Sequence, residues 1–334
     1  MIPNIAPPSP DAIARAAGLL RAGLLVAFPT ETVYGLGADA ANPDAVARIF
    51  AAKGRPADHP VIVHIASAAA IGHWARDVPD GARRLADAFW PGPLTMVLPR
   101  AAHVSDLVTG GQDSVGLRVP SHPVARALLD AFGGGIAGPS ANRFGRISPT
   151  TARHVVDDLG EAVAMTLDGG ACAVGIESTI VAFTTATGAP VLLRPGGIGI
   201  DALARVLGVV PGAPGATAPR ASGTLAAHYA PRTRATLVAA DALHAEIRLL
   251  AGRDERIAVL AHSVARPGDF AGVWRVAPAD PVRYAHDLYA SLRALDDAKA
   301  DVILVEAVPG DSAWLAVRDR LARATHGDDD DDRD

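Results

Sequence analysis

Short apolar runs that end at proline, glycine or charged residues alternate with helix-like segments along the first 200 residues. The run from Leu24 to Phe28 is stopped by Pro29, which is typical of a buried strand that delivers a loop. Similar runs predict strands over 61–65, 94–98, 114–119, 136–138, 165–168, 178–183 and 191–193. Helical spacing predicts helices over 10–22, 43–52, 81–88, 123–131, 150–159 and 201–207. The mixture predicts a twisted, mixed α/β sheet.

A change of composition after this region divides the chain. The stretch VVPGAPGATAPRASG has almost no apolar periodicity and is typical of a linker. Beyond it, strands alternate with helices and predict a small, doubly wound, Rossmann-like domain with a parallel sheet. The expected strands are 235–238, 256–261, 273–277 and 301–306, and the expected helices are 241–251, 281–297 and 313–324.

We therefore expect four parts. They are a mixed-sheet domain over 1–205, a linker or lid over 206–232, a small α/β domain over 233–326 and an acidic, disordered tail over 327–334.

Charge and composition limit the possible partners and compartment. With 31 Lys and Arg against 36 Asp and Glu, the formal net charge is −5, which excludes nucleic-acid binding through bulk positive charge. The single cysteine, Cys172, excludes an internal disulfide framework and a zinc site built from cysteines. No secretory signal and no apolar run of bilayer-spanning length is present, so we expect a cytoplasmic protein that is not embedded in a membrane.

The first group of residues that could carry chemistry follows the strand that ends at Phe28. The segment FPTETVYGLG places hydroxyls, a carboxylate and two glycines after a strand end, where α/β proteins bind ligands. Alternatively, Thr30 or Thr32 caps the next turn and the glycines permit tight backbone geometry. The segment is neither a Walker A loop nor a spaced dinucleotide fingerprint.

The second group, KGRPADHPVIVH, contains Lys53, one of only two lysines in the chain; the other is Lys299. It joins Lys53 and Arg55 to two histidines between a predicted helix and a strand. Cations at a helix C-terminus also complement the helix dipole, but the histidines and prolines exceed what a cap requires. The cations suit phosphate or carboxylate groups.

Two further groups point to anion recognition. Arg118 falls inside an apolar strand and needs an anion, which is either a structural carboxylate or a ligand. In GPSAN, Ser140 and Asn142 stand at a strand exit and can donate to phosphate oxygens. Ser178 and Arg194 again place a hydroxyl and a guanidinium near strand ends. Together these groups indicate a basic, hydroxyl-lined cavity for a nucleotide and a small polar acid.

Taken jointly, the motifs resemble the YrdC-like threonylcarbamoyl-AMP synthases. The resemblance rests on FPTETVYGLG, KGRP with HPVIVHI, WPGPLT, GLRVPSHP, GPSAN, GIESTI and LLRPGG, in that order. It covers about residues 10–200, and HYAP at 228–231 is similar to the long, two-domain form of the family. The resemblance implies a YrdC-like domain followed by the small Rossmann-like domain.

The resemblance also implies a role for each matched position. The catalytic residues would be Lys53 and Arg55. The threonine pocket would be lined by Thr32, His64, Arg118, Gly138 and Ser178. The ATP site would be formed by Arg55, His59, Ser114, Ser140, Asn142, Ser148, Arg194 and, as a residue that closes over the nucleotide, Tyr229. Two positions depart from the family pattern, because His59 replaces an Asn and Ser114 replaces a Thr.

The family condenses L-threonine, bicarbonate or CO2 and ATP into threonylcarbamoyl-AMP and releases pyrophosphate. The resemblance implies Mg²⁺ carried by ATP, no metal held by the protein itself, and a product consumed by a downstream tRNA threonylcarbamoyl transferase complex. Contact with tRNA would be indirect or weak.

Two alternatives differ in class. One is an RNA-binding maturation factor with secondary nucleotide turnover, which the acidic balance and the lack of a basic-aromatic stripe disfavour. The other is carbamoyl transfer in hydrogenase maturation, which also uses YrdC-like domains. Proteins of that class carry zinc-finger and acylphosphatase segments, for which this chain has neither the cysteines nor the length.

Overall fold

The computed structural model describes residues 4–183 and 189–326, and the chain divides into two compact units. The first unit spans Met1–Phe144 and Ser148–Thr224, and the second spans Gly145–Ile147 and Leu225–Asp334. Residues 206–224 of the expected linker thus group with the first unit, and three residues of the loop after GPSAN group with the second. The expected acidic tail, 327–334, lies outside the described residues.

The described part of the first unit contains a ten-stranded mixed sheet. Its strands are β1 (Ile5–Ala6), β2 (Val26–Phe28), β3 (Gly35–Asp39), β4 (Ile62–His64), β5 (Leu94–Pro99), β6 (Ser114–Arg118), β7 (Ile136–Ala137), β8 (Met165–Leu167), β9 (Thr179–Ala182) and β10 (Val191–Arg194). They follow the order β1-β8-β2-β3-β7-β4-β6-β5-β9-β10. The pairs β1/β8, β2/β8, β4/β6 and β5/β9 are parallel, and the other neighbours are antiparallel. The expectation of a mixed sheet is confirmed.

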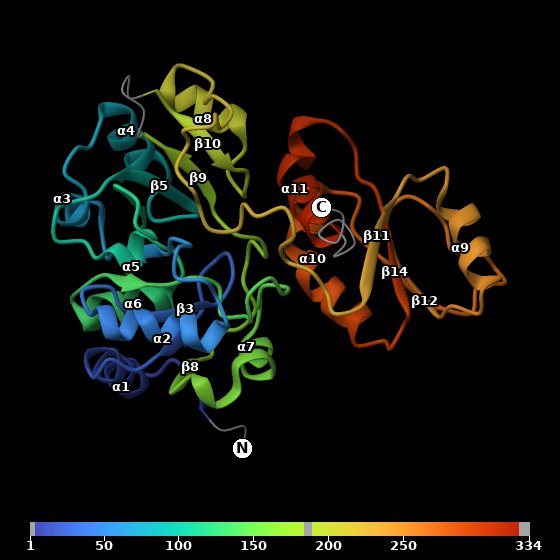
Figure 1. The fold of residues 1–334 in the computed structure, drawn as a ribbon, viewed down its shortest axis with the longest axis horizontal. Helices are drawn as coiled ribbons and strands as arrows, with labels where there is room; N and C mark the ends of the chain where they lie inside the picture. Colours follow the sequence, from blue (N-terminus) through green and yellow to red (C-terminus); the bar gives the residue numbers. More distant parts are fainter. Residues whose placement is uncertain (1–3, 184–188, 327–334) are drawn as a thin grey trace. The chain divides into compact units, whose positions relative to one another are not determined.

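Helices cover both faces of this sheet (Figure 1). They are α1 (Pro10–Arg21), α2 (Pro43–Lys53), α3 (Ile71–Trp74), α4 (Asp80–Phe89), α5 (Asp106–Thr109), α6 (Pro123–Phe132), α7 (Ala152–Leu159) and α8 (Ile200–Leu207), with 3-10 turns η1 (Ala68–Ala70) and η2 (Gly160–Ala162). In β2, Val26 and Phe28 pack with α1 and α6, whereas Ala27, like Leu25 just before the strand, faces the larger core that includes α2 and α4. Because both faces are buried, the strand reads as one continuous apolar run.

The segment 28–37, expected to be a loop, contains part of β3. This strand pairs antiparallel with β2, with Phe28 opposite Gly35 and Val26 opposite Gly37. A Cβ atom on Gly37 would lie 2.9 Å from side-chain atoms of both Ile136 and Phe28, so close packing excludes larger residues there. Glycines allow β3 to pack closely against its neighbours. Because glycine has no side chain, the segment also lacks the alternation of polar and apolar residues by which strands are predicted.

The second unit contains a four-stranded parallel sheet in the order β11-β14-β12-β13, which confirms the small doubly wound domain. Its strands are β11 (Arg234–Val238), β12 (Ile257–Ala261), β13 (Val273–Val276) and β14 (Val302–Glu306). Its helices are α9 (Leu243–Ala251), α10 (Pro281–Asp296) and α11 (Leu315–Ala324), with a 3-10 turn η3 (Ser312–Trp314). In the described part of the chain, no helix is both long and apolar enough to cross a membrane.

Candidate functional site

Three of the predicted threonine-site residues lie at strand ends that the sheet brings together, and Thr32 lies in the turn between β2 and β3. His64 ends β4, Arg118 ends β6, and the two are paired across neighbouring parallel strands. Arg118 Nη1 donates to Thr32 Oγ1 over 2.8 Å, which ties the turn between β2 and β3 to this edge. Gly138 directly follows β7 and lies next to His64. A Cβ atom on Gly138 would be 3.0 Å from Nδ1 of the His64 ring.

Arg118 is buried and pairs with Glu31. Arg118 Nη2 lies 2.7 Å from Glu31 Oε1, and the two side chains are only 4% and 8% exposed. Nε donates to Gly92 O over 3.3 Å, and the Ser121 N–H donates to Glu31 Oε2. Burial alone would raise the pKa of Glu31, but Arg118 outweighs burial and holds that pKa below its usual range. The structural carboxylate considered for Arg118 is therefore present, and it is Glu31.

His64 is held as a neutral ring. Burial, and then the nearby charge of Arg118, lowers the pKa of His64 from 6.5 to about 3. The ring meets Phe28 edge-on with centroids 5.6 Å apart. Near neutral pH, His64 therefore adds no charge to this edge of the sheet and could meet a ligand only as an uncharged ring.

Ser178, the fifth predicted threonine-site residue, connects this edge to Arg194. Its Oγ lies 2.7 Å from Thr95 Oγ1 on β5 and accepts from Arg194 Nη2 over 3.2 Å. Arg194 Nε and Nη2 also donate to the Ser178 carbonyl oxygen. Its Nη1 donates to the carbonyl oxygen of Ser222 over 2.6 Å. Arg194, which belongs to the predicted ATP set, thus contacts the predicted threonine set through Ser178.

Lys53 is positioned by the end of α2. Asn42 caps the start of that helix, and Gly54, with φ of 64°, ends it in the left-handed conformation. The side-chain nitrogen of Lys53 donates to the carbonyl oxygens of Ser140, over 2.5 Å, and of Asn142. Burial, followed by the charge of Arg55, lowers the pKa of Lys53 well below 10.5. Lys53 therefore holds the GPSAN loop in this structure.

Arg55 and His59 both contact the aromatic ring of Phe144. Arg55 Cζ is 5.9 Å from the centroid of the Phe144 ring, and the His59 ring meets that ring at 5.4 Å. Arg55 Nη2 donates to Pro60 O over 2.8 Å and to Ser222 Oγ over 3.3 Å. Burial and Arg55 lower the pKa of His59. Both residues thus belong to one cluster with Ser222.

The remaining predicted ATP-site residues of the first unit lie on its strands and loops. Ser140 forms an isolated bridge with Gly35 of β3, and Asn142 Nδ2 donates to Arg143 O. Ser148 is fully buried and donates to Glu177 Oε1 over 2.6 Å. Glu177, the acid in GIESTI, therefore holds the hydroxyl of Ser148, a residue that the family resemblance places in the ATP site.

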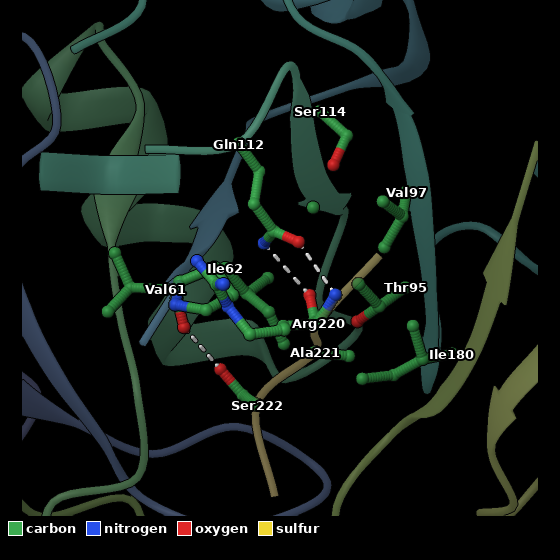
Figure 2. A pocket seen from close by; sticks show the side chains of 12 residues that line it. Val61, Ile62, Thr95, Val97, Gln112, Ser114, Ile180, Arg220, Ala221 and Ser222 are labelled. Carbon is green, nitrogen blue, oxygen red and sulfur yellow. Dashed lines mark hydrogen bonds between the residues drawn. The ribbon is translucent and has the colours of Figure 1, made fainter. Parts of the chain in front are cut away.

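A pocket of about 290 Å³, part of which is open to solvent, lies over β4, β6, β5 and β9 (Figure 2). Its floor comes from β4, β5, β6 and β9, including Ser114, and its cover comes from the segment after α8. The lining residues are Pro60, Val61, Ile62, Thr95, Val97, Gln112, Ser114, Gly116, Ile180, Arg220, Ala221 and Ser222.

The cover is fastened by specific hydrogen bonds (Figure 2). Gln112 Oε1 accepts from the Arg220 N–H over 2.7 Å, and Gln112 Nε2 donates to the Arg220 carbonyl oxygen over 3.1 Å. Ser222 Oγ donates to Pro60 O over 2.7 Å. Ala221 packs in an apolar cluster with Val97 and other residues of β5, β9 and β10. Residues 220–222, which their composition predicts to be part of a linker, are therefore packed against the sheet.

Tyr229 belongs to the second unit. There its ring packs against Tyr289 of α10 at 5.6 Å, and Arg320 of α11 lies over it with Cζ 5.3 Å from the centroid. Its φ of 62° is the left-handed conformation, which is uncommon for an aromatic residue. The prediction that Tyr229 closes over a nucleotide is not tested by these contacts.

The structure adds residues that sequence reasoning missed. They are Glu31, Thr95, Gln112, Glu177, Arg220 and Ser222. Glu31 and Glu177 stand inside quoted motifs and could have been found by asking which acid balances a buried guanidinium or accepts from a buried hydroxyl. Within the described residues, no cluster of three or more His, Cys, Asp or Glu side chains could hold a metal ion.

Comparison with known proteins gives matches along nearly the whole chain. A family model described as "Telomere recombination" matches residues 18–196, and one described as "Threonylcarbamoyl-AMP synthase, C-terminal domain" matches residues 198–326. The chain is similar to the threonylcarbamoyl-AMP synthase of Pyrococcus abyssi, with 41% identity over 325 residues and 93% of each chain covered. It is also similar to that of Bacillus subtilis, with 40% identity over 336 residues, covering 94% of this chain and 93% of the relative.

A solved structure shows the same fold. It is the crystal structure of P. abyssi Sua5 complexed with L-threonine, which is 37% identical and has a TM-score of 0.89. The match covers 97% of each chain, so both units have counterparts in that protein.

Proposed function

This chain belongs to the threonylcarbamoyl-AMP synthase family, and from that premise we propose that it joins L-threonine, bicarbonate or CO2 and ATP into threonylcarbamoyl-AMP, with release of pyrophosphate. The product would serve N6-threonylcarbamoyladenosine formation in tRNA. A separate threonylcarbamoyl transferase complex would consume it, and this chain itself would have indirect or weak contact with tRNA.

The observation that carries the proposal is the convergence of Arg55 and Arg194 on one residue. Arg55 donates to the hydroxyl of Ser222 and Arg194 donates to its carbonyl oxygen. Both arginines are buried, with 8% and 2% exposure, and at Ser222 both donate to neutral oxygens. Phosphate oxygens are stronger acceptors for arginine than a hydroxyl or a carbonyl. Ser222 thus occupies a position where the phosphates of ATP would bind.

The neighbouring edge is suited to an amino acid. Thr32, His64 and Ser178 offer uncharged donors and acceptors, and the charge of Arg118 is already balanced by Glu31. A guanidinium carries five N–H groups, which leaves Arg118 able to bind a carboxylate while it contacts Glu31, Thr32 and Gly92. Ser178 contacts Arg194 directly, so the two substrates would lie next to each other.

The reaction needs positioning more than a protein nucleophile. The threonine amine, as the free base, attacks CO2 to form a carbamate with loss of one proton. A carbamate oxygen then attacks the α-phosphorus of ATP, the bond to the bridging oxygen breaks, and pyrophosphate leaves. Holding the two anions together supplies most of the rate, and cationic donors neutralise the charge that develops on the phosphates.

Arg55 and Arg194 are suited to that neutralisation, and Lys53 supports it by fixing the GPSAN loop. Mg²⁺ would enter as part of the ATP complex. The bound ion would offset phosphate charge.

The segment that covers the pocket would act as a lid. Ser222 leaves the two guanidinium groups when the phosphates bind, and the bonds of Gln112 to Arg220 allow the segment to close again. Tyr229, which follows this segment in the sequence, would then contribute to closure.

The test is direct detection of the product. Purified protein is incubated with threonine, bicarbonate, ATP and Mg²⁺, and threonylcarbamoyl-AMP is measured by mass spectrometry while each component is omitted in turn. We expect product only in the complete mixture. Product formation independent of threonine, or none in the complete mixture, would refute the proposal. An RNA affinity tighter than that for ATP would favour an RNA-binding factor instead.

A further inference from the structure

Thr95 on β5 is a fully buried residue of the first unit that lies outside both predicted substrate sets. Together with Val97 it lines the pocket (Figure 2). The opposite face of the strand belongs to the large core, through Leu94, Met96 and Leu98. Side chains alternate between the two faces of a strand, so β5 places a hydroxyl where the surrounding core does not require one.

The register of the sheet brings Thr95 into one row with two residues of the predicted threonine site. β5 and β6 pair antiparallel with Met96 opposite Leu117, and one residue farther along this register Thr95 lies opposite Arg118. Arg118 is in turn paired with His64 of β4. Residues that pair across neighbouring strands project from the same face of the sheet. Thr95 therefore lies on the face that carries the predicted threonine site, one strand beyond Arg118.

The hydroxyl of Thr95 is bonded to Ser178, the residue before β9. The two oxygens, Thr95 Oγ1 and Ser178 Oγ, are 2.7 Å apart, and Arg194 Nη2 donates to the same Ser178 oxygen. A hydroxyl can accept two hydrogen bonds and donate one. When Thr95 donates to Ser178, both acceptor positions of Ser178 are filled, by Thr95 and by Arg194.

This arrangement leaves the proton of Ser178 to be donated elsewhere. Thr95 and Ser178 are both buried, and a buried hydroxyl proton without an acceptor is costly. Thr95 finds its acceptor in Ser178, whereas Ser178 belongs to the predicted threonine set. An oxygen of a bound amino acid would therefore supply the acceptor that the Ser178 proton needs.

We propose that Thr95 is a positioning residue for the threonine site, which donates to Ser178 and so turns the Ser178 hydroxyl toward the bound amino acid as a donor. The inference rests on the proposed function, since it takes Ser178 as a ligand of threonine. Thr95 acts through Ser178 and takes no part in the chemistry. Its β-branched side chain suits this role, because such side chains are stiff about the first torsion angle and hold the hydroxyl in one direction.

The test compares three variants of the full chain. Thr95→Val keeps the shape of the side chain and removes the hydroxyl, whereas Thr95→Ser keeps the hydroxyl and removes the methyl group. Thr166→Val is the matched control, because Thr166 is also fully buried in the sheet of the first unit and its Oγ1 has no hydrogen-bond partner among the described residues.

We expect Thr95→Val to raise the threonine Kd, measured by calorimetry without ATP, about three- to tenfold, which corresponds to the loss of one hydrogen bond. Thr95→Ser should recover most of the loss, and Thr166→Val should match the wild type.

ATP affinity separates positioning from a general structural defect. The ATP Kd, measured without threonine, should change less than about twofold in Thr95→Val, because Arg194 keeps its bonds to the Ser178 carbonyl oxygen. An unchanged threonine Kd in Thr95→Val, an equal loss for threonine and ATP, or no recovery in Thr95→Ser would overturn the inference. Calorimetry needs no turnover, so a wild type that binds threonine but forms no product would contradict the proposed function alone. A wild type that binds no threonine would overturn both.

Discussion

At the residue scale, three buried basic side chains of the first unit each have hydrogen-bond or ion-pair partners. Arg118 faces Glu31, Lys53 faces two carbonyl oxygens, and Arg194 faces Ser178 and Ser222. Uncompensated charges would be costly in such an environment, so these pairs fix the side chains before any substrate arrives. Preorganised donors of this kind are what a phosphoryl-transfer site needs.

Lys53→Ala is expected to lower kcat about 100-fold while changing threonine Kd less than about twofold. The substitution leaves the carbonyls of Ser140 and Asn142 without their ammonium donor, and the nucleotide loop loses its fixed position. Pyrophosphate release measures kcat, and calorimetry measures threonine binding. Lys299→Ala, which removes the other lysine from an exposed position, is the matched control. Normal pyrophosphate release by Lys53→Ala would contradict the prediction.

His64 should make stability depend on pH. Its pKa is about 3 in the folded protein against an ordinary value of 6.5, so between these values the unfolded chain binds a proton that the folded chain does not. The contribution of His64 to the free energy of unfolding is therefore complete above pH 6.5 and is lost as pH falls toward 3. Urea titrations at several pH values should show a shallower decline for His64→Gln. An identical decline in both proteins would count against a buried neutral ring.

At the element scale, close backbone approach decides where the motifs stand. Gly196 of LLRPGG lies against the start of β9, where a Cβ atom would be 2.4 Å from the Thr179 nitrogen and 2.7 Å from Glu177 O. The motif therefore needs glycine for packing in addition to its arginine. Gly199, three residues on, has open space around it and a φ of −70°.

Gly196→Ala should lower the free energy of unfolding by roughly 1–3 kcal/mol, because a methyl group forces β9 and the residue Ser178 before it to move. Gly199→Ala should leave the free energy of unfolding nearly unchanged. Urea unfolding of both variants measures the difference. Equal stabilities of the two variants would show that the backbone of β9 yields without cost.

At the scale of the whole molecule, each unit has its own sheet, and the chain passes between them more than once. The first unit takes residues up to Thr224, which bring Arg220 and Ser222 onto its pocket, while the second takes Gly145–Ile147. Domain boundaries drawn along the sequence therefore do not coincide with the compact units. The residues that follow α8 are expected to influence substrate binding from outside the mixed sheet.

Removal of residues 209–334, which keeps α8 intact, should raise the apparent Michaelis constants for ATP and threonine several-fold, in keeping with the loss of a lid. The truncated protein loses the cover formed by Arg220 and Ser222. Steady-state kinetics beside the full chain would check this. If the constants stay unchanged in a folded truncation, the C-terminal part is a passive appendage.

The sequence by itself determined the strands and helices whose burial pattern is continuous. The runs at 24–28 and 257–261 are apolar throughout, and the run at 94–98 is apolar except for Thr95. Both faces of the sheets are covered there, and β2, β5 and β12 occur in these runs. The sequence also determined the mixed sheet, the parallel second sheet and the motifs that identify the family. Local composition suffices for these features because each one depends on neighbouring residues.

Which side chains interact with one another was decided only by the tertiary structure. Glu31 meets Arg118 from 87 positions away in the chain, and no local pattern records such a pair. The contact between Ser222 and Arg194 was not predictable either, because the residues around Ser222 have the composition of a linker. In the structure, Ala221 packs on an apolar surface of β5, β9 and β10 and brings Ser222 to Arg194. Which donors face each other depends on how distant strands come into register, and that register is a property of the folded sheet and is not written in any short stretch of sequence.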